Sequence, residues 1–357
     1  MWRRTGRRAL RVDMSLGSFI PYVLICVVGQ IIVRRPSHLS FSMEREWRHV
    51  VPSGTAAAGP KIRVLQYNIL AEDLAKGSDG DIAKFDSVAH LRQPHAAGVH
   101  YYRTPLYECY KFRTNQASLA WARRKALILA EIRRHAPDII CLQEVDNFHD
   151  LKTELELDGF SGLFGRSRGK RIRHGNVVFW RNLDFRLQEH KCVHLGENIM
   201  TALLVKFISK DGVPLVVCST HLKAGMTQEF EDLRVRQVTM LQSAISQLAG
   251  TDAVILGADL NAHYANYSLC TPTTCCNPSL QVTAKVIPCL ETAGFTNAYD
   301  DYPSFTSWAG WLDRDVKLSL DYIMLKGPLA AMSALDVPPD DLVADHPDRM
   351  PNDKCPS

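Results

Sequence analysis

The chain lacks an excess of one charge along most of its 357 residues, whose formal net charge is +4. Seven arginines stand within the first 35 residues, and without that segment the rest of the chain carries about −2. A domain that holds nucleic acid by general electrostatic attraction is strongly basic. The composition therefore excludes a basic nucleic-acid clamp, and any contact with nucleic acid must come from local patches.

Paired cysteines are also lacking. The chain has ten cysteines, but no two of them are separated by two residues. Structural zinc sites commonly use Cys-x-x-Cys pairs, and small secreted domains use regular cysteine frameworks. The spacing favours neither, whereas the hydrophobic share of 46% is ordinary for a globular protein.

One long apolar run is present, at residues 14–33, with arginines on both sides. A membrane span needs about 20 apolar residues, and more arginine before the run than after it would leave the N-terminus in the cytosol. A cleaved signal peptide, an arginine-rich mitochondrial presequence and a misassigned start of the coding sequence are alternatives that stay open. We therefore expect residues 1–36 to be a targeting or membrane-anchor segment, residues 37–60 a linker and residues 61–357 the folded domain. The expected location is membrane-anchored or mitochondrial.

Strand and helix patterns alternate through the domain. Strands are predicted at residues 62–67, 137–146, 176–180, 199–208, 214–220, 253–257 and 318–325. Helices are predicted at 118–135 and 230–248, where apolar residues recur with helical spacing. Because many strands are joined with few helices between them, we expect an α/β fold with two packed sheets flanked by helices.

Four of the predicted strands end in polar residues that suit one kind of chemistry. These ends are Tyr67-Asn68, Gln143-Glu144, Thr220-His221 and Asp259-Leu260-Asn261. Strand ends are rigid and open to solvent, which is where α/β folds place their reactive groups. Hydrolysis of a phosphate ester requires a cation on the phosphoryl oxygens and an activated water. The pattern therefore predicts a divalent-metal phosphodiesterase site.

Each residue type at these strand ends suits a different role in such a site. Glu144 offers the hard oxygen ligand that Mg²⁺ prefers. Asp259 and Asn261 can share a second ion or the attacking water, while Asn68 can hold a carboxylate or a metal-bound water. His221 can donate to a phosphate oxygen. Each residue alone is more often a solvated, turn or capping residue, so the prediction rests on their joint presence in one domain.

Five stretches of the chain resemble the endonuclease/exonuclease/phosphatase family, and within it the nocturnin and carbon-catabolite-repressor deadenylase subfamily. These stretches are residues 61–71, 138–146, 219–224, 257–262 and 320–323. The resemblance implies a two-sheet α/β sandwich, dependence on Mg²⁺ or on Mn²⁺ in its place, and hydrolysis of a phosphodiester or nucleotide phosphate. It also implies that Asp321 works with a histidine, as a carboxylate–imidazole pair does.

The resemblance assigns the same roles at the strand ends. It implies metal binding by Glu144 and Asn68, a phosphate contact by His221, and water activation near Asp259 and Asn261. On the substrate side it implies binding by three further residues, which are Lys223, Asn198 and Arg234.

Three departures leave the substrate open. Gly225 stands where nocturnin has an arginine, and His174-Gly175-Asn176 stands where the subfamily usually has Asp-Gly-Cys. The segment Tyr302 to Trp311 replaces the family's short Thr-Thr-Trp segment. We expect a 3′-5′ exoribonuclease of the deadenylase type that acts on RNA. A nocturnin-like 2′-phosphatase acting on the nucleotide NADP(H) is the alternative within the enzyme class.

The resemblance also implies a catalytic Asp-His pair that opens a last strand. The sequence up to Ser357 resembles the segment that leads into this pair, so we expect the last strand to be missing. Asp345-His346 is the candidate within the chain, but Pro347 follows it, and proline does not suit the start of a central strand. A non-catalytic fragment or scaffold is therefore a third reading.

Overall fold

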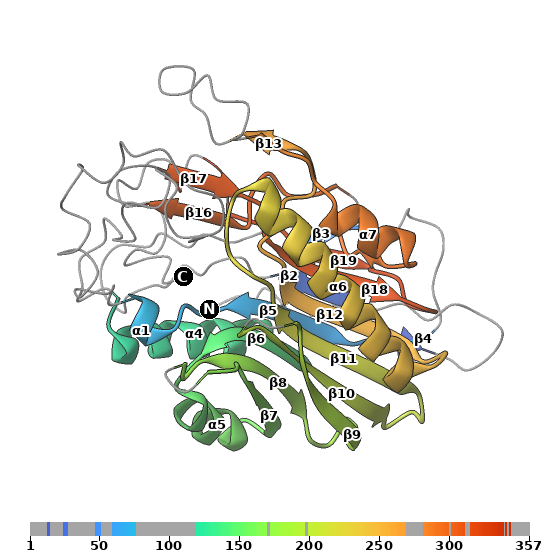
Figure 1. The fold of residues 1–357 in the computed structure, drawn as a ribbon. Coiled ribbons are helices and arrows are strands. Elements are labelled where there is room, and N and C mark those ends of the chain that lie inside the picture. The colour runs from blue at the N-terminus through green and yellow to red at the C-terminus, as the bar shows by residue number, and fades with distance from the viewer. Residues whose placement is uncertain are drawn as a thin grey trace, which may run out of the picture.

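The computed structural model describes residues 13–14, 24–27, 47–50, 59–75, 119–169, 172–196, 199–268, 281–299, 301–310, 315–338, 340 and 343. Its main feature is a pair of β-sheets packed face to face, with helices on both outer faces (Figure 1). This confirms the predicted two-sheet α/β sandwich.

The first sheet has the strand order β2-β5-β6-β8-β7 in the described residues. Its strands are β2 (Leu24–Val27), β5 (Arg63–Asn68), β6 (Ile139–Val145), β7 (Phe160–Arg166) and β8 (Gly175–Arg181). Helices α4 (Trp121–His135) and α5 (Phe148–Leu157) cover its outer face, and α1 (Glu72–Ala75) follows β5.

The second sheet has the order β15-β18-β12-β11-β10-β9 in the same part of the chain. Its strands are β9 (Phe185–His194), β10 (Thr201–Ser209), β11 (Pro214–His221), β12 (Ala253–Asp259), β15 (Thr296–Asn297) and β18 (Asp321–Lys326). Helices α6 (Gln228–Ala249) and α7 (Val286–Thr292) pack on its outer face.

Short strand pairs complete the described fold. They are β1 (Asp13–Met14) with β4 (Gly59–Pro60), β3 (Trp47–His49) with β19 (Ser333–Leu335), β13 (Tyr267–Ser268) with β14 (Gln281–Val282), and β16 (Ser307–Gly310) with β17 (Asp315–Leu318). The β16–β17 pair precedes β18, so the strand predicted at 318–325 begins three residues later, after the link Ser319-Leu320.

Strand direction brings the predicted strand ends together. β5 and β6 run parallel, and β11 and β12 run parallel with His221 beside Asp259. The antiparallel neighbour β18 then places Asp321 opposite Asp259. Because parallel strands end at the same edge of a sheet, the polar ends of both sheets gather at one end of the sandwich.

Part of the predicted linker packs on the domain. Within residues 37–60, β3 pairs with β19, Trp47 packs against the core beneath α4, and Val50 packs between the sheets. The contacts of the domain therefore reach back at least to Trp47, ahead of the expected start at Lys61, because an indole and a valine supply apolar anchors that a free linker would not need.

The apolar run 14–33 is described only in part. Leu24–Val27 forms the edge strand β2, parallel to β5. No helix among the described residues is long and apolar enough to cross a membrane. Most of the run lies outside the described residues, so the membrane anchor and the mitochondrial presequence stay predictions.

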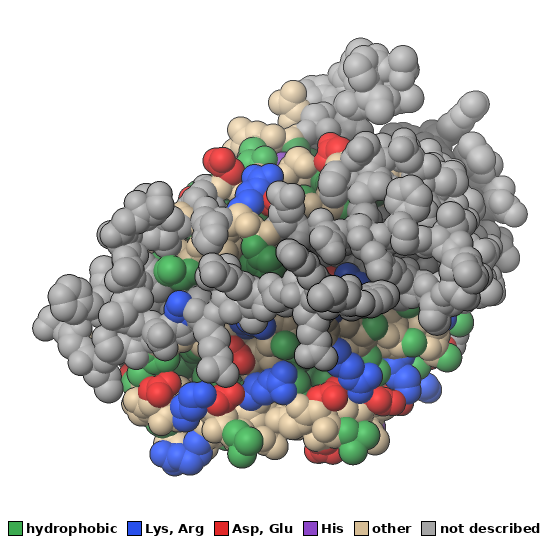
Figure 2. Space-filling view, turned by 180° about the vertical axis from the view of Figure 1, so that it is seen from behind, with side chains coloured by type: hydrophobic (Ala, Val, Ile, Leu, Met, Phe, Trp, Pro, Cys, Tyr) green, Lys and Arg blue, Asp and Glu red, His purple; other side chains and the backbone are tan. Residues whose placement is uncertain are grey.

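Charged side chains of both signs are interspersed on the surface seen in Figure 2. On that face, Lys and Arg alternate with Asp and Glu along the described lower edge, without gathering into a single-sign patch. This agrees with the balanced composition of the domain.

The two sheets approach closely at Gly257 in β12. A Cβ atom built there would lie 2.7 Å from Cβ and 2.9 Å from Sγ of Cys141 in β6. Glycine is needed here because no side chain fits between the two backbones. The close approach lets polar side chains of both sheets bond to each other.

Gly257→Ala should destabilise the protein by about 1–3 kcal/mol, the usual cost of overpacking a tight core. Chemical denaturation would measure this. The same substitution in a Cys141→Gly background should cost clearly less, because the Cβ and Sγ atoms that clash with it are gone. Equal costs in both backgrounds would contradict the close-approach explanation.

Trp47→Ala should lower the free energy of unfolding by about 2–3 kcal/mol, somewhat below the usual cost for a fully buried tryptophan. The indole is partly buried against the core and meets the His135 ring edge-on at 6.3 Å. Arg48→Ala is the matched control, because that side chain in the same strand is exposed and forms a surface ion pair with Asp336. If the thermal midpoint dropped equally for both variants, β3 would stabilise the domain through its backbone pairing with β19 and not through the packing of the Trp47 side chain.

Candidate active site

Glu144 occupies a β-bulge at the end of β6. Leu142 pairs with Val177 and Val145 with Gly175, so two residues of β6 face one residue of β8. Glu144 has φ +56°, a left-handed conformation that is strained for a residue with a side chain. Bulges of this kind re-aim a side chain. Here the carboxylate is turned toward the end of the sandwich, and it is largely buried.

Asn68 joins the carboxylates of the two sheets. Its Nδ2 donates to Glu144 Oε1 at 3.0 Å and to Asp259 Oδ2 at 2.8 Å. Its Oδ1 accepts the Leu70 N–H at 3.0 Å. Both amide hydrogens are thus directed at carboxylates, so Asn68 holds the two acids in place while its oxygen faces the backbone. This fits the predicted carboxylate-holding role better than the predicted role of metal ligand.

His221 and Asn261 form a second pair beside the acids. The Asn261 Nδ2 donates to the Leu222 carbonyl at 3.1 Å and lies 2.7 Å from His221 Nε2. Since an amide hydrogen of Asn261 points at it, His221 Nε2 is the acceptor, which leaves Nδ1, 3.8 Å from Glu144 Oε1, as the ring nitrogen that can donate. The Asn261 N–H donates to Asp259 Oδ1 at 2.9 Å, which its positive φ of +48° allows.

Asp321 is buried deeper in the same cluster. Gln66 Nε2 donates to its Oδ1 at 2.9 Å and the Thr306 hydroxyl to its Oδ2 at 2.9 Å. Burial, followed by the charge of Asp259, raises the pKa of the Asp321 carboxyl well above its ordinary value. The expected histidine is not among its partners in the described residues, where an amide and a hydroxyl take that place. Asp345 and His346 lie outside the described residues.

A layer of buried polar side chains lies between the two sheets next to the carboxylates and connects the sheets by hydrogen bonds. Gln66 of β5 donates to Gln143 of β6 at 2.7 Å, and Gln143 donates to Ser219 and to the Gly257 carbonyl of the other sheet, both at 3.1 Å. The Ser219 hydroxyl donates back to Leu142 O at 3.1 Å. Gln66, Ser219 and Thr306 could not be identified from the sequence, because a single polar residue gives no signal of the distant partner that it bonds.

The substrate-side residues are placed differently from one another. Lys223 follows His221, is half-buried, and has its Nζ 5.6 Å from the Phe230 ring centroid. Burial, with the charge of Arg234, lowers the pKa of the Lys223 ammonium. Arg234 is fully buried and pairs with Glu231, which does not suit direct contact with a substrate. Asn198 lies outside the described residues.

Arg234 acts instead on the loop that carries Lys223. Its Nη1 donates to the carbonyls of Lys223 at 3.0 Å and Gly225 at 2.7 Å. Gln237 accepts the Lys223 N–H at 3.0 Å. Both peptide groups of Lys223 are therefore fixed from α6, so Arg234 positions this loop.

The acids suit a divalent cation. Glu144, Asp259 and Asp321 gather without an ion pair to lysine or arginine among the described residues, where only His221 lies within ion-pairing distance of the first two. Among the described residues, no group of three or more His, Cys, Asp and Glu side chains is placed so that it could hold a metal ion. Mg²⁺ does not need such a group, since it usually takes one or two carboxylates and keeps several waters. Glu144 and Asp259 fit that requirement.

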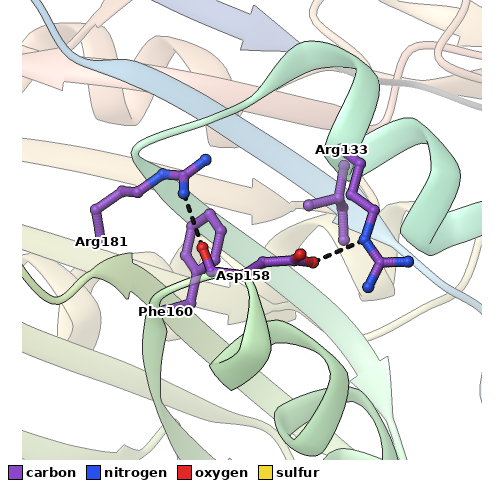
Figure 3. Close-up of a pocket in the computed structure, with 5 residues that line it drawn as sticks. Arg133, Asp158, Phe160 and Arg181 are labelled. Carbon is purple, nitrogen blue, oxygen red and sulfur yellow. Dashed lines mark hydrogen bonds and ion pairs between the residues drawn. The ribbon is translucent and has the colours of Figure 1, made fainter.

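A small pocket lies away from these acids. It is lined by Ile132, Arg133, Asp158, Phe160 and Arg181, at the end of β8 opposite the Glu144 bulge (Figure 3). Arg133 Nε bonds Asp158 Oδ2 at 2.7 Å, and Arg181 Nη1 donates to the Asp158 carbonyl at 2.9 Å. Its arginines are engaged within the protein, and it contains none of the predicted site residues.

The fold and the site define a class of protein. The endonuclease/exonuclease/phosphatase family matches residues 65–346, and the chain belongs to this family of hydrolytic enzymes. Within the family it groups with nocturnin and the carbon catabolite repressor proteins.

Individual relatives are distant. Human nocturnin is 27% identical over 322 residues, which are 84% of this chain and 63% of that protein. The Ccr4 3′-5′-exoribonuclease subunit of the CCR4-Not complex from Coccidioides immitis is 24% identical over 178 residues, or 40% of this chain and 24% of that protein. The structure of ANGEL2, described as a 2′,3′-cyclic phosphatase, has a TM-score of 0.62 at 16% identity and covers 89% of this chain and 96% of that one. The chain spans less than two thirds of the length of the curated relatives it matches first.

The raised pKa of Asp321 predicts a pH dependence in the absence of divalent cations. Because the folded-state pKa exceeds the ordinary value of 3.8, ionisation of Asp321 opposes folding. This penalty is absent below that value and grows as the pH rises toward the folded-state pKa. Asp321→Asn should therefore gain stability relative to the native protein as the pH rises from about 4 to about 7.

Urea denaturation of both proteins across this range would measure the effect. An asparagine in place of Asp321 also disturbs two hydrogen bonds, but the cost of losing them does not vary with pH. The pH dependence of the difference in unfolding free energy between the two proteins therefore reports the ionisation of the Asp321 carboxyl. A flat difference would mean that Asp321 titrates normally.

Proposed function

We propose that this protein hydrolyses phosphodiester bonds at the 3′ end of RNA with a bound Mg²⁺, or Mn²⁺ in its place. The observation that carries the proposal is the pair of carboxylates from opposite sheets, Glu144 and Asp259, held by one amide group beside His221. A divalent cation bound there would polarise the phosphoryl oxygens and lower the pKa of a bound water.

The residues of the chain have defined tasks in this proposal. The Nδ1–H of His221 donates to a non-bridging phosphoryl oxygen, because Nε2 is engaged by Asn261. The Asn261 Oδ1 orients the attacking water, since the hydrogens of that amide are used by His221 and Leu222. Asp259 accepts the proton of that water. Its oxygens each accept one hydrogen bond in the structure and keep a free lone pair.

RNA is favoured as the substrate for two reasons. The name of the Coccidioides relative describes a 3′-5′-exoribonuclease. The loop 222–226 carries one charged residue, Lys223, which suits the single charge of a phosphodiester. At Gly225 a Cβ atom would lie 2.2 Å from the Phe230 ring, so the packing leaves no room there for the arginine of nocturnin.

A 2′-phosphatase acting on NADP(H) is the second candidate. The similarity to human nocturnin supports it, as does the half-buried Lys223 ammonium next to the site. The two activities differ in their substrates and can be separated directly, by incubating the purified protein with Mg²⁺ and either an oligoadenylate with a free 3′-hydroxyl or NADP(H).

Glu144→Gln should lower the rate of Mg²⁺-dependent hydrolysis about 10³-fold, because the cation supplies several kcal/mol of transition-state stabilisation. Release of mononucleotide from the oligoadenylate measures it. Glu156→Gln is the control, a carboxylate-to-amide change on the exposed surface of α5.

Three outcomes separate the possibilities. Phosphate release from NADP(H) without cleavage of the oligonucleotide would favour the second candidate. Activity within tenfold of the native rate in Glu144→Gln would contradict the site. A native protein that binds RNA but turns over neither substrate would favour the scaffold reading.

A further inference from the structure

Arg124 of α4 is a fully buried arginine whose hydrogen bonds go to main-chain carbonyls. It forms no ion pair with a carboxylate among the described residues, whereas the equally buried Arg234 is paired with Glu231 at 2.7 Å. Burial lowers the pKa of Arg124, and the charges of Asp146 and Glu144 oppose that effect. Burying a cation costs desolvation free energy unless hydrogen bonds compensate for it. The hydrogen-bond partners of Arg124 therefore indicate which part of the structure it stabilises.

Those bonds go to the turn that follows Asn68. The Arg124 Nη1 donates to the carbonyl of Ile69 at 2.6 Å and to that of Leu70 at 2.7 Å, while its Nε donates to Leu119 O at 2.8 Å. Leu70 has φ +55°, a strained conformation for a leucine. Such a conformation persists only where the surroundings fix it. The guanidinium fork supplies that constraint.

The same turn holds the carboxylate of Glu144 from two sides. The Ala71 N–H donates to Glu144 Oε2 at 3.1 Å, and Asn68 Nδ2 donates to Glu144 Oε1 at 3.0 Å. The Asn68 side chain is in turn fixed by the Leu70 N–H. Both oxygens of the proposed metal ligand are therefore oriented by a turn whose carbonyls are bonded to Arg124.

We propose that Arg124 is a positioning residue for divalent-cation binding, which sets the orientation of the Glu144 carboxylate through the 69–71 turn. The inference rests on the proposed function, because Glu144 is taken as the metal ligand. Outer residues that orient a ligand commonly change metal affinity by about 10–100-fold when they are replaced. The guanidinium is needed because a planar fork reaches two adjacent carbonyls and a third at a fixed angle, which an ammonium does not.

The positive charge of Arg124 acts against the proposed role, since it also repels a cation at Glu144. Arg124→Lys separates the two effects because it keeps the charge and loses the fork. Arg124→Met removes both and serves as the second variant.

Arg181 provides a matched control. It too donates to two main-chain carbonyls, those of Pro137 and Asp158, and lies over an aromatic ring, Phe160, at 4.3 Å (Figure 3). Arg181 lies six residues along β8 from Gly175, and Gly175 pairs with Val145 beside the Glu144 bulge. At the usual rise of a strand, these six residues place Arg181 about 20 Å from the site. Arg181→Lys therefore reproduces the loss of a carbonyl-binding fork far from the acids.

The experiment measures the dissociation constant of Mn²⁺ by titration calorimetry, with circular dichroism to establish that each variant is folded. Arg124→Lys should bind Mn²⁺ at least about tenfold more weakly than the native protein, and Arg124→Met should also bind it more weakly than the native protein, although the repelling charge is gone. Arg181→Lys should stay within about twofold. Hydrolysis, where present, should show a raised Mg²⁺ requirement and an unchanged KM for the nucleotide.

The outcomes distinguish the two proposals. Unchanged Mn²⁺ affinity in a folded Arg124→Lys or Arg124→Met, while Glu144→Gln loses binding, would overturn the role of Arg124 and leave the metal site intact. Tighter binding in Arg124→Met than in the native protein would also overturn it, since repulsion would then outweigh positioning. Native protein that does not bind Mn²⁺, or Glu144→Gln that binds it normally, would overturn both.

Discussion

The two hydrogen bonds that Asn68 donates, one within its own sheet and one across the sandwich, are the constraint on which the site depends. They connect Glu144 of one sheet to Asp259 of the other, at 3.0 and 2.8 Å. One amide reaches both acids only because the sheets are close, and they are close because Gly257 has no side chain to keep Cys141 away. The need for glycine at position 257 in the core thus sets the separation between Glu144 and Asp259, where the chemistry is proposed.

Strain is concentrated at the same place. Of the four described non-glycine residues with positive φ, three belong to the site, namely Leu70, Glu144 and Asn261, and the fourth, Ala136, ends α4. Each of the three is held by hydrogen bonds from a neighbouring strand end, turn or helix, and the polar layer of Gln66, Gln143 and Ser219 lies beneath them. Preorganised groups of this kind do not have to rearrange during a reaction, which is how electrostatic catalysis gains its advantage. Folding energy from the apolar cores offsets the strain and the crowding of like charges.

Positioning residues outnumber the groups that would touch a substrate. Arg234 holds the Lys223 loop, Thr306 and Gln66 hold Asp321, and Arg124 holds the turn after Asn68. All four are buried, and two of them, Gln66 and Arg124, bond to partners 255 and 55 positions away in the sequence. Thr306 and Arg234 bond to partners 15 and 11 positions away.

The sequence by itself determined which residues lie at strand ends and what chemistry they suit, because hydrophobic periodicity marks the strands and side-chain type marks the donors. It predicted the sandwich, the strands at residues 199–208 and 214–220 and the helix at 230–248, all of which are present. It did not predict β7, β9 or α5, and it placed the domain start at Lys61 although β3 packs on the core. Only the tertiary structure decided that Asn68 faces two carboxylates, that Asp321 meets Gln66 and Thr306 in place of a described histidine, and that Arg234 is buried. The physical reason is that these contacts join residues up to 255 positions apart, so they exist only once two sheets have packed and Gly257 has brought them within hydrogen-bonding distance.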